Sequence, residues 1–170
     1  MNITYRDGTP DDAATVRAVY LESFDAIFKH LYKVEDYDAF IATQDEAAFR
    51  AQLGDSAYAF RLACLDDLLV GFCKLGPPSL PYDATGRTCV ELRQLYLLDM
   101  AKGTGIALVL TDWVVAEARQ RGAVELWLSV FSDNPRARRF YARYGFEEVG
   151  EFKFMVGNHA DDEFLCRLRL

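Results

Sequence analysis

Two glycines separated by one residue, Gly103 and Gly105, stand before a segment of helical pattern in this chain of 170 residues. Glycines at such a position let backbone N–H groups approach an anion closely, and the free amides at the start of a helix favour a phosphate. The turn does not fit the G-x-G-x-x-G dinucleotide fingerprint, because Leu108 occupies the place of the third glycine. It also lacks the spacing of a nucleoside-triphosphate loop. The pattern is therefore compatible with a phosphate site or with a purely structural turn.

The segments around this turn predict the elements that hold it in place. Residues 88–98 are rich in Val, Leu and Tyr and predict a strand, and apolar residues at helical spacing predict a helix over 106–121. Further strands are predicted at 3–6, 58–65, 68–75, 124–131, 146–155 and 164–170, and further helices at 10–24, 44–53 and 135–144. The proline- and glycine-rich stretch 76–86 predicts a loop. This order predicts an α/β fold, with a mixed sheet and helices on both faces.

Length and composition limit the classes of protein to which this chain can belong. One domain spanning 1–170 is expected, because a chain of this size buries about 70% of its unfolded surface around one core. Hydrophobic residues make up 51% and charged residues 26%, which is the composition of a folded protein rather than a disordered one. With 19 Lys and Arg against 26 Asp and Glu, the net charge of −7 argues against nucleic acid as a partner.

We expect neither a targeting segment nor a metal site. The amino terminus carries charges where a signal peptide needs an apolar stretch, and no segment approaches the ~20 apolar residues that span a bilayer. These features predict no membrane partner and a cytoplasmic location. The four cysteines are widely spaced without a C-x-x-C pair, and the two histidines leave little material for a metal centre.

The glycine turn and a second block of residues together match a known pattern. Lys102, Gly105 and Ala107 fill the frame Q/R-x-x-G-x-G/A, with lysine where glutamine or arginine is usual. The second block fits N-x-x-A-x-x-F-Y-x-x-x-G-F through Asn134, Ala137, Phe140, Tyr141, Gly145 and Phe146. With both motifs in this order, the sequence resembles the GCN5-related N-acetyltransferase (GNAT) family over 88–149. The resemblance implies a single-domain GNAT fold, a mixed and mostly antiparallel sheet of about six to seven strands flanked by helices on both faces.

The same resemblance implies that acetyl-CoA is the cosubstrate and that no metal takes part. Backbone amides of the glycine loop hold the pyrophosphate in this family, so Lys102 should be tolerated and adds a cation beside the phosphates. Arg143 would lie near the ribose phosphate, whereas without the resemblance it belongs to a solvated helix face. The implied contacts to acetyl-CoA are Leu95, Tyr96, Leu97, Lys102, Gly103, Thr104, Gly105, Ile106, Ala107, Asn134 and Arg143.

Acetyl transfer to an amine needs a base for the ammonium, a donor for the developing oxyanion and a proton for the departing thiolate. The resemblance implies Tyr141 as the general acid to the sulfur and the backbone N–H of Leu97 as the oxyanion donor. Asn134 would contact the pantetheine arm or an ordered water, although capping of a helix explains it equally well. Glu91, on the strand before the glycine loop, is the candidate base, and an ion pair with Arg93 is the alternative.

The acceptor amine is the least defined part of the prediction. Residues 154–164 resemble the end of bacterial spermidine/spermine-type acetyltransferases, and the net charge of −7 would attract a polycation. We therefore expect N-acetylation of a small cationic amine such as a polyamine. Asp161, Asp162 and Glu163 could line its entrance, but a solvated turn is the favoured interpretation. Acetylation of a protein N-terminus or lysine, or a non-catalytic acetyl-CoA-binding module, remain alternatives, and a homodimer is compatible with the sequence.

Overall fold

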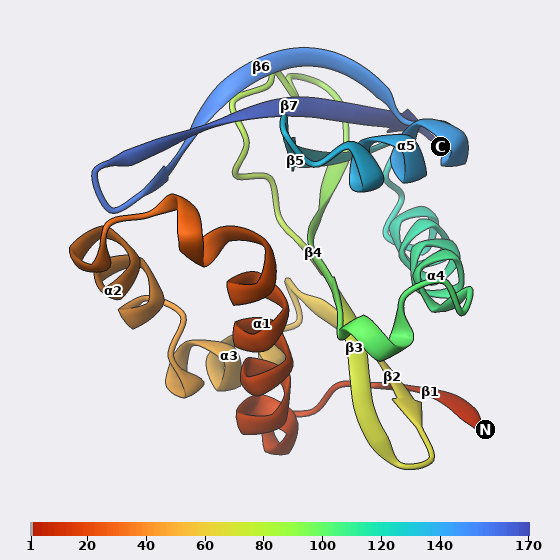
Figure 1. Cartoon of the computed structure of the whole chain (residues 1–170). Coiled ribbons are helices and arrows are strands. Elements are labelled where there is room, and N and C mark those ends of the chain that lie inside the picture. The colour runs from red at the N-terminus through yellow and green to blue at the C-terminus, as the bar shows by residue number, and fades with distance from the viewer. Residues whose placement is uncertain (1) are drawn as a thin grey trace.

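A seven-stranded sheet runs through residues 2–170, the part of the chain that the computed structural model describes (Figure 1). The strand order is β1-β2-β3-β4-β5-β7-β6, and every neighbouring pair is antiparallel except β4 and β5, which are parallel. The strands are β1 (Ile3–Asp7), β2 (Ala59–Leu65), β3 (Leu68–Gly76), β4 (Cys89–Leu97), β5 (Glu125–Phe131), β6 (Glu147–Val156) and β7 (His159–Arg169). The mostly antiparallel sheet predicted from the sequence is confirmed.

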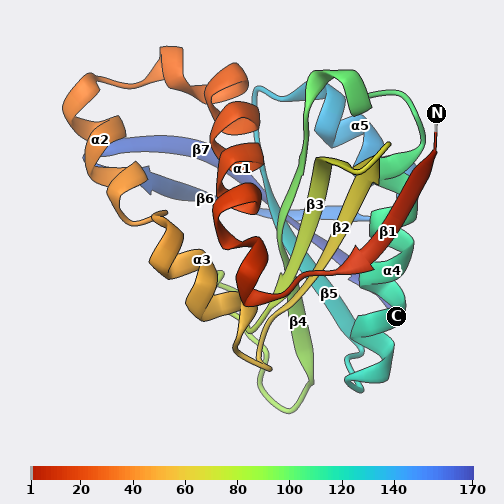
Figure 2. The same ribbon diagram turned by 90° about the horizontal axis from the view of Figure 1, so that it is seen from below.

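Helices cover both faces of this sheet. One face carries α1, α2 and α3, and the other carries α4 and α5 (Figures 1 and 2). The helices are α1 (Ala13–Phe28), α2 (Val34–Ala42), α3 (Glu46–Leu53), α4 (Ile106–Gln120) and α5 (Pro135–Tyr144). Four of them agree with the predicted segments. The sequence analysis missed α2, although Val34, Tyr37 and Ile41 follow a helical spacing, because nine residues are fewer than the window over which such a spacing identifies a helix.

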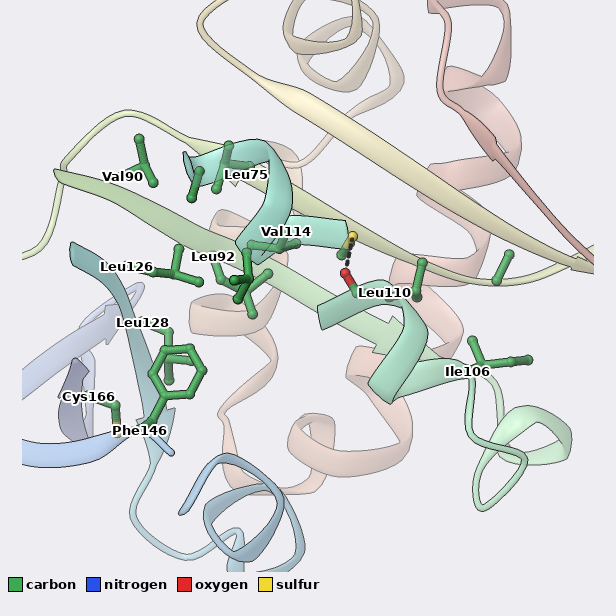
Figure 3. Packing of buried hydrophobic residues seen from close by; sticks show 14 of the residues in the cluster. Leu75, Val90, Leu92, Ile106, Leu110, Val114, Leu126, Leu128, Phe146 and Cys166 are labelled. Carbon is green, nitrogen blue, oxygen red and sulfur yellow. Dashed lines mark hydrogen bonds between the residues drawn. The ribbon is translucent and has the colours of Figure 1, made fainter. Parts of the chain in front are cut away.

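Alternation of side chains along the central strands builds two separate apolar layers. On β3, Phe72 points to the layer under α1 and α3, while Cys73 points to the layer under α4. Figure 3 shows the second layer, in which Leu110 and Val114 of α4 pack against side chains of β3, β4 and β5. The Cys73 thiol donates a hydrogen bond to the carbonyl oxygen of Leu110 (3.7 Å), which ties the helix to the sheet (Figure 3).

Strands β4 and β5 pair only at one end. Their register covers three residues on each strand, Cys89–Glu91 against Glu125–Trp127, although β4 has nine residues and β5 has seven. The two strands therefore separate beyond Glu91, and β4 runs away from β5 (Figure 1). The register between β3 and β4 shifts just there, because Lys74 pairs with Gln94 and Leu75 with Leu92, leaving Arg93 as an extra residue. Such a bulge bends its strand.

The hairpin of β6 and β7 is longer than the sequence predicted. β7 begins at His159, not at residue 164, so the expectation of a solvated turn at 161–163 is wrong for Asp161, which is 4% exposed. The turn is confined to 157–158, and the strand alternation then directs Asp161 inward and Asp162 outward. This turn is docked on α2, because the Asn158 N–H donates to Asp36 Oδ1 (2.7 Å). The hairpin thereby reaches over the α1–α2 side of the molecule (Figure 1).

The longest helix, α1, has sixteen residues, and within residues 2–170 no helix combines the length and apolar character needed to cross a bilayer.

Substitution of Gly157 by alanine tests the contact between the hairpin and α2. Its φ of +57° is left-handed, and an added Cβ would lie 2.6 Å from Asp36 Cα, a backbone atom that cannot swing away. Gly86→Ala is the matched control, since φ is +72° there but nothing lies within 4 Å of the added Cβ. In urea unfolding, Gly157→Ala should lose about 1 kcal/mol or more beyond the loss in Gly86→Ala. If the two variants lost the same stability, the left-handed backbone conformation alone would account for the loss, and the contact between Gly157 and Asp36 would contribute nothing.

Candidate active site

A cavity of about 750 Å³ occupies the opening between β4 and β5. Side chains from both faces of the sheet line it. From the α1–α3 face and the hairpin come Tyr20, Ser23, Phe24, Phe28, Tyr32, Phe40, Lys74, Phe154, Asp161 and Glu163. From the α4–α5 face come Lys102, Gly103, Gly105, Ala107, Asn134, Arg136, Ala137, Phe140 and Tyr141. Because the strands part, the cavity continues through the sheet and is within the size range of small-molecule sites.

The backbone of β4 directs hydrogen-bonding groups into this opening. The Leu98 N–H donates to the Val70 carbonyl on β3 (2.8 Å), and Leu97 faces Gly71 in the antiparallel register. Since successive amides of a strand point to opposite sides, the N–H of Leu97 points away from β3 and toward the gap. The predicted oxyanion donor is therefore a backbone group that is turned toward the cavity. The backbone N–H of Leu95, two residues earlier in β4, points in the same direction as that of Leu97.

The glycine turn lies at the other side of the gap, before α4. Gly103 and Gly105 have φ of +81° and +88°, a conformation that glycine adopts without strain. No atom lies within 4 Å of the positions that their Cβ atoms would occupy, so backbone conformation rather than lack of space requires glycine. The amides of Leu108 and Val109 donate to the Gly105 carbonyl, and the N–H groups at the helix start that precede them have no intrahelical acceptor. The turn thus presents amides beside the cations Lys102 and Arg136.

Tyr141 and Asn134 both face the cavity from α5. Burial raises the pKa of the Tyr141 phenol, which keeps its proton at neutral pH, and its ring packs edge-on against Phe146 at 5.6 Å. A protonated phenol is the form that can act as an acid. Asn134 Oδ1 accepts the Ala137 N–H (3.1 Å) and caps the helix. The amide nitrogen of Asn134 is left for a ligand, so capping and contact with a ligand are compatible.

Three of the residues expected to contact acetyl-CoA do not line the cavity with their side chains. Thr104 donates its hydroxyl to the Ala101 carbonyl (2.6 Å), and Ile106 is buried in the apolar layer under α4. Arg143 is exposed on α5, whereas Arg136 on the same helix lines the cavity. Thr104 and Ile106 are therefore positioned to contribute backbone groups only.

Glu91 is 1% exposed and holds the loop over 77–86 in place. Its carboxylate accepts the N–H of Ser79 (2.6 Å), the hydroxyl of Ser79 (2.9 Å) and the N–H of Leu80 (2.8 Å). Arg93 Nε lies 3.8 Å from Glu91 Oε2. The ion pair that the sequence analysis gave as the alternative role of Glu91 is therefore present. Tyr82 fixes the loop further by stacking on Trp127, with ring centroids 4.0 Å apart. Glu91 lines the cavity, but both of its oxygens are occupied.

Two further carboxylates enter the cavity from β7. Asp161 Oδ2 accepts the hydroxyl of Tyr32 (2.5 Å), and its Oδ1 lies 3.2 Å from His159, so this carboxylate is engaged. Glu163, two residues along the same face of the strand, lines the cavity beside Ser129. Desolvation by burial, with a smaller contribution from the charge of Asp161, raises the pKa of Glu163 to about 7, although a hydrogen bond from Ser129 acts in the opposite direction. A carboxyl group with such a pKa in a cavity is suited to exchange protons at neutral pH.

The sequence analysis offered Glu163 as a residue of the acceptor entrance but favoured a solvated turn at this position. The signal that would have found it is the alternation from Asp161 to Glu163, which continues the period of a strand once the turn is placed at 157–158. Lys74 was missed altogether, since a single lysine in an apolar strand gives no motif. In the structure Lys74 is buried on β3, and its side chain lines the cavity.

Known proteins share this fold and sequence pattern. The model of the acetyltransferase (GNAT) family matches residues 19–146. The chain is 34% identical over 155 residues to an "Uncharacterized N-acetyltransferase" of Mycobacterium bovis, covering 91% of this chain and 95% of that protein. The PaiA N-acetyltransferase of Thermoplasma acidophilum, solved in complex with coenzyme A, has a TM-score of 0.78 at 20% identity and full coverage of both chains. The ribosomal-protein-S18-alanine N-acetyltransferase of Escherichia coli has a TM-score of 0.72 at 15% identity, covering 99% of this chain and 94% of that chain.

The chain therefore belongs to the acetyltransferase (GNAT) family and is an N-acetyltransferase of the GNAT type. The two solved structures, at this low identity, establish the likeness of the fold. The fold implied by the two sequence motifs is confirmed.

Replacement of Glu163 by glutamine should change stability in a pH-dependent way. A carboxyl group whose pKa rises from 4.5 to about 7 on folding opposes folding once it ionises, fully above pH 7 and not below pH 4.5. Glu163→Gln should therefore be more stable than the wild type at pH 8, by up to roughly 3 kcal/mol, and the difference should vanish near pH 4.5. Urea unfolding at both pH values measures it.

Asp162→Asn is the matched control for that change. Asp162 is adjacent on β7 but exposed, with Lys153 as its partner, so its removal should leave the pH dependence of stability unaltered. A Glu163→Gln variant with the same stability gap at pH 4.5 and pH 8 would contradict the burial of an ionisable group at this position.

Proposed function

We propose that this protein transfers the acetyl group of acetyl-CoA to the primary amine of a small cationic molecule. The observation that carries the proposal is the cavity through the sheet. One mouth is formed by the glycine turn and α5, and the other by α1, α2 and the β6–β7 hairpin. A donor and an acceptor that enter from opposite mouths meet beside β4, where the Leu97 N–H is directed.

The residues at the first mouth fit acetyl-CoA. The amides of the turn at Gly103 and Gly105, together with Lys102 and Arg136, supply donors and positive charge for a pyrophosphate. The pantetheine arm would run beside the free edge of β4 at Leu95 and Leu97. Acetyl-CoA supplies the reactive thioester when it is bound. The exposed position of Arg143 leaves it available to a phosphate at the rim.

The residues around the gap have the properties that acetyl transfer demands. Glu163, with its pKa near 7, accepts the proton that an ammonium must lose before its nitrogen can attack. The Leu97 N–H stabilises the negative charge that develops on the carbonyl oxygen. Tyr141 keeps its proton because burial raises its pKa, and it donates that proton to the departing sulfur. The three groups act on three different atoms of the substrates: Glu163 on the amine nitrogen, the Leu97 N–H on the carbonyl oxygen, and Tyr141 on the sulfur.

Glu91 remains the second candidate for the base. It lines the cavity, and a water molecule held by its carboxylate could carry a proton from the amine. Its three hydrogen bonds to Ser79 and Leu80 favour a different role, which is to hold the loop over the acceptor mouth. Within residues 2–170, no backbone amide donates to Glu163 and its hydrogen bond is with the Ser129 side chain, so its carboxylate is the freer of the two.

The acceptor mouth fits an ammonium group. Phe24, Phe28, Phe40 and Phe154 form an aromatic wall, and Glu163 contributes a carboxylate at its edge. Aromatic faces and carboxylates together attract organic cations. A polyamine, the prediction from the sequence, is one member of this class of acceptors.

The proposed function is tested by thiol release from acetyl-CoA with a panel of primary amines, including spermidine and a lysine peptide, followed by mass spectrometry of the products. A monoacetylated small amine is expected. Release only with the lysine peptide would favour a protein acceptor, and binding of acetyl-CoA without release with any amine would favour a binding module.

Tyr141→Phe should lower kcat by about 10²-fold or more while acetyl-CoA affinity, measured by calorimetry, stays near the wild-type value. The phenol is needed only when the sulfur departs, so its loss affects turnover and not binding. Tyr144→Phe is the matched control on the same helix, because Tyr144 does not line the cavity and donates instead to Asp112 (2.7 Å). Wild-type turnover in Tyr141→Phe would refute the assignment.

The two candidate bases are separated by pH–rate profiles of Glu163→Gln and Glu91→Gln. If Glu163 is the base, kcat/KM of the wild type falls as the pH drops through about 7, because the carboxylate becomes protonated. Glu163→Gln should lower kcat/KM and abolish that limb of the profile. Glu91→Gln should instead keep the limb and raise KM for the acceptor. The reverse pattern would assign the base to Glu91.

A further inference from the structure

Lys74 is a buried cation in the acceptor part of the cavity. It lies on β3, is 4% exposed, and its side chain shares the α1–α3 face of the sheet with Phe72. Its ammonium donates one hydrogen bond, to Gln52 Oε1 (2.8 Å). The nitrogen otherwise lies over three aromatic rings, at 5.6–6.0 Å from the ring centroids of Phe49, Tyr58 and Phe60.

No carboxylate balances this charge. Among residues 2–170, no carboxylate oxygen lies within 4.0 Å of Lys74 Nζ, and the other charged group that acts on it is the cation Arg93 on β4. Burial lowers the pKa of Lys74 to about 7, so that about half of the groups are ammonium at neutral pH, and an anion bound beside it would favour the ammonium form. An ammonium has three donors, and one is used, so two remain for a ligand in the cavity.

Two unpartnered polar atoms lie in the same part of the cavity. Gln94 Oε1 and Ser23 Oγ are buried and have no hydrogen-bond partner among the described residues, and both side chains line the cavity. Gln94 faces Lys74 directly in the register between β3 and β4. Buried polar groups are rarely left unpaired, so these atoms indicate that a polar ligand completes this region. The Ser23 hydroxyl can donate to an anion, whereas Gln94 Oε1 only accepts, and the Lys74 ammonium that it faces is the donor suited to it.

The charges of the acceptor cavity are divided between two walls. Glu163 on β7 supplies negative charge to one wall, and Lys74 on β3 supplies positive charge to the other. Arg93 pairs with Glu91 at 3.8 Å, and Asp161 is engaged by Tyr32 and His159, so Lys74 and Glu163 are the two groups of opposite charge in this part of the cavity that have no ion-pair partner among residues 2–170. An acceptor with one ammonium and one singly charged anion would neutralise both walls.

We propose that Lys74 binds a carboxylate of the acceptor, so that the substrate is a primary amine of the amino acid type. The inference rests on the proposed function for the donor, the reaction and the ammonium group of the acceptor, and it replaces an acceptor of net positive charge by a zwitterion. A single unbalanced cation matches the single charge of a carboxylate. A polyamine would place a second ammonium near Lys74 and leave its donors without acceptors.

Matched acids and amides test this inference. Phenylalanine, 4-aminobutanoate and 5-aminopentanoate, which differ in the spacing between amine and carboxylate, are each compared with their carboxamide and with spermidine in the thiol-release assay. Binding of each N-acetylated acid and of its amide is measured by calorimetry in the presence of CoA. For at least one pair, the acid should be preferred at least tenfold by the wild type, since a buried charged hydrogen bond is lost in the amide.

Lys74→Met should reduce that preference to within about threefold, because the methionine keeps the volume but lacks the charge. Lys153→Met is the matched control. Lys153 is exposed on β6, where strand alternation places it on the face opposite Phe154, and its removal should leave the preference intact. Stabilisation of each variant by acetyl-CoA in thermal unfolding verifies that the donor site is folded.

Three results would overturn the inference. They are equal use of acid and amide in every pair, a preference that persists in Lys74→Met, and acetylation of spermidine with no amino acid accepted. The last result would leave the proposed function standing. Conversely, preferential binding of the acetylated acids without thiol release from any amine would support the carboxylate site and reject the proposed function.

Discussion

The short pairing of β4 and β5 is the constraint on which the rest of the structure depends. Two parallel strands that hydrogen-bond over three residues and then diverge leave the backbone groups on their facing edges without a strand partner, although β3 and β7 pair with their other edges. Unpaired amides inside a protein require another partner. Here the consequence is a cavity that crosses the sheet, with the Leu97 N–H directed into it. The bulge at Arg93 bends β4 at the point where the strands part, and so contributes to the same opening.

The two mouths of the cavity are built by different means. At the α4–α5 side, the backbone supplies the binding groups, through the left-handed glycines and the open amides at the start of α4. At the other side, side chains supply them, through the aromatic wall, Glu163 and Lys74. A site made of backbone groups depends little on which side chains surround it, whereas a site made of side chains changes with each substitution.

The sequence pointed to most of the residues that line the α4–α5 mouth of the cavity and to few of those at the other mouth, for the same reason. Gly103, Gly105 and Tyr141 belong to short local motifs whose spacing is visible in one stretch of chain. The acceptor side is assembled from β3, β7, α1 and α2, so Lys74 and Glu163 meet the same cavity although they are far apart in sequence. Helix α2 is too short for its periodicity to identify it, and placing a turn at 161–163 assigned to solvent the two acids, Asp161 and Glu163, that line the cavity. Only tertiary packing, which a local pattern does not contain, reveals these contacts.

A crystal structure of the protein with acetyl-CoA would test most directly whether the gap between β4 and β5 is the reaction site. The structure presented here predicts the pyrophosphate at the Gly103–Gly105 turn and the thioester carbonyl oxygen within about 3 Å of the Leu97 nitrogen. It also predicts the sulfur beside the Tyr141 hydroxyl. Acetyl-CoA bound outside the gap, or with its carbonyl oxygen held by a group other than β4, would contradict the assignment.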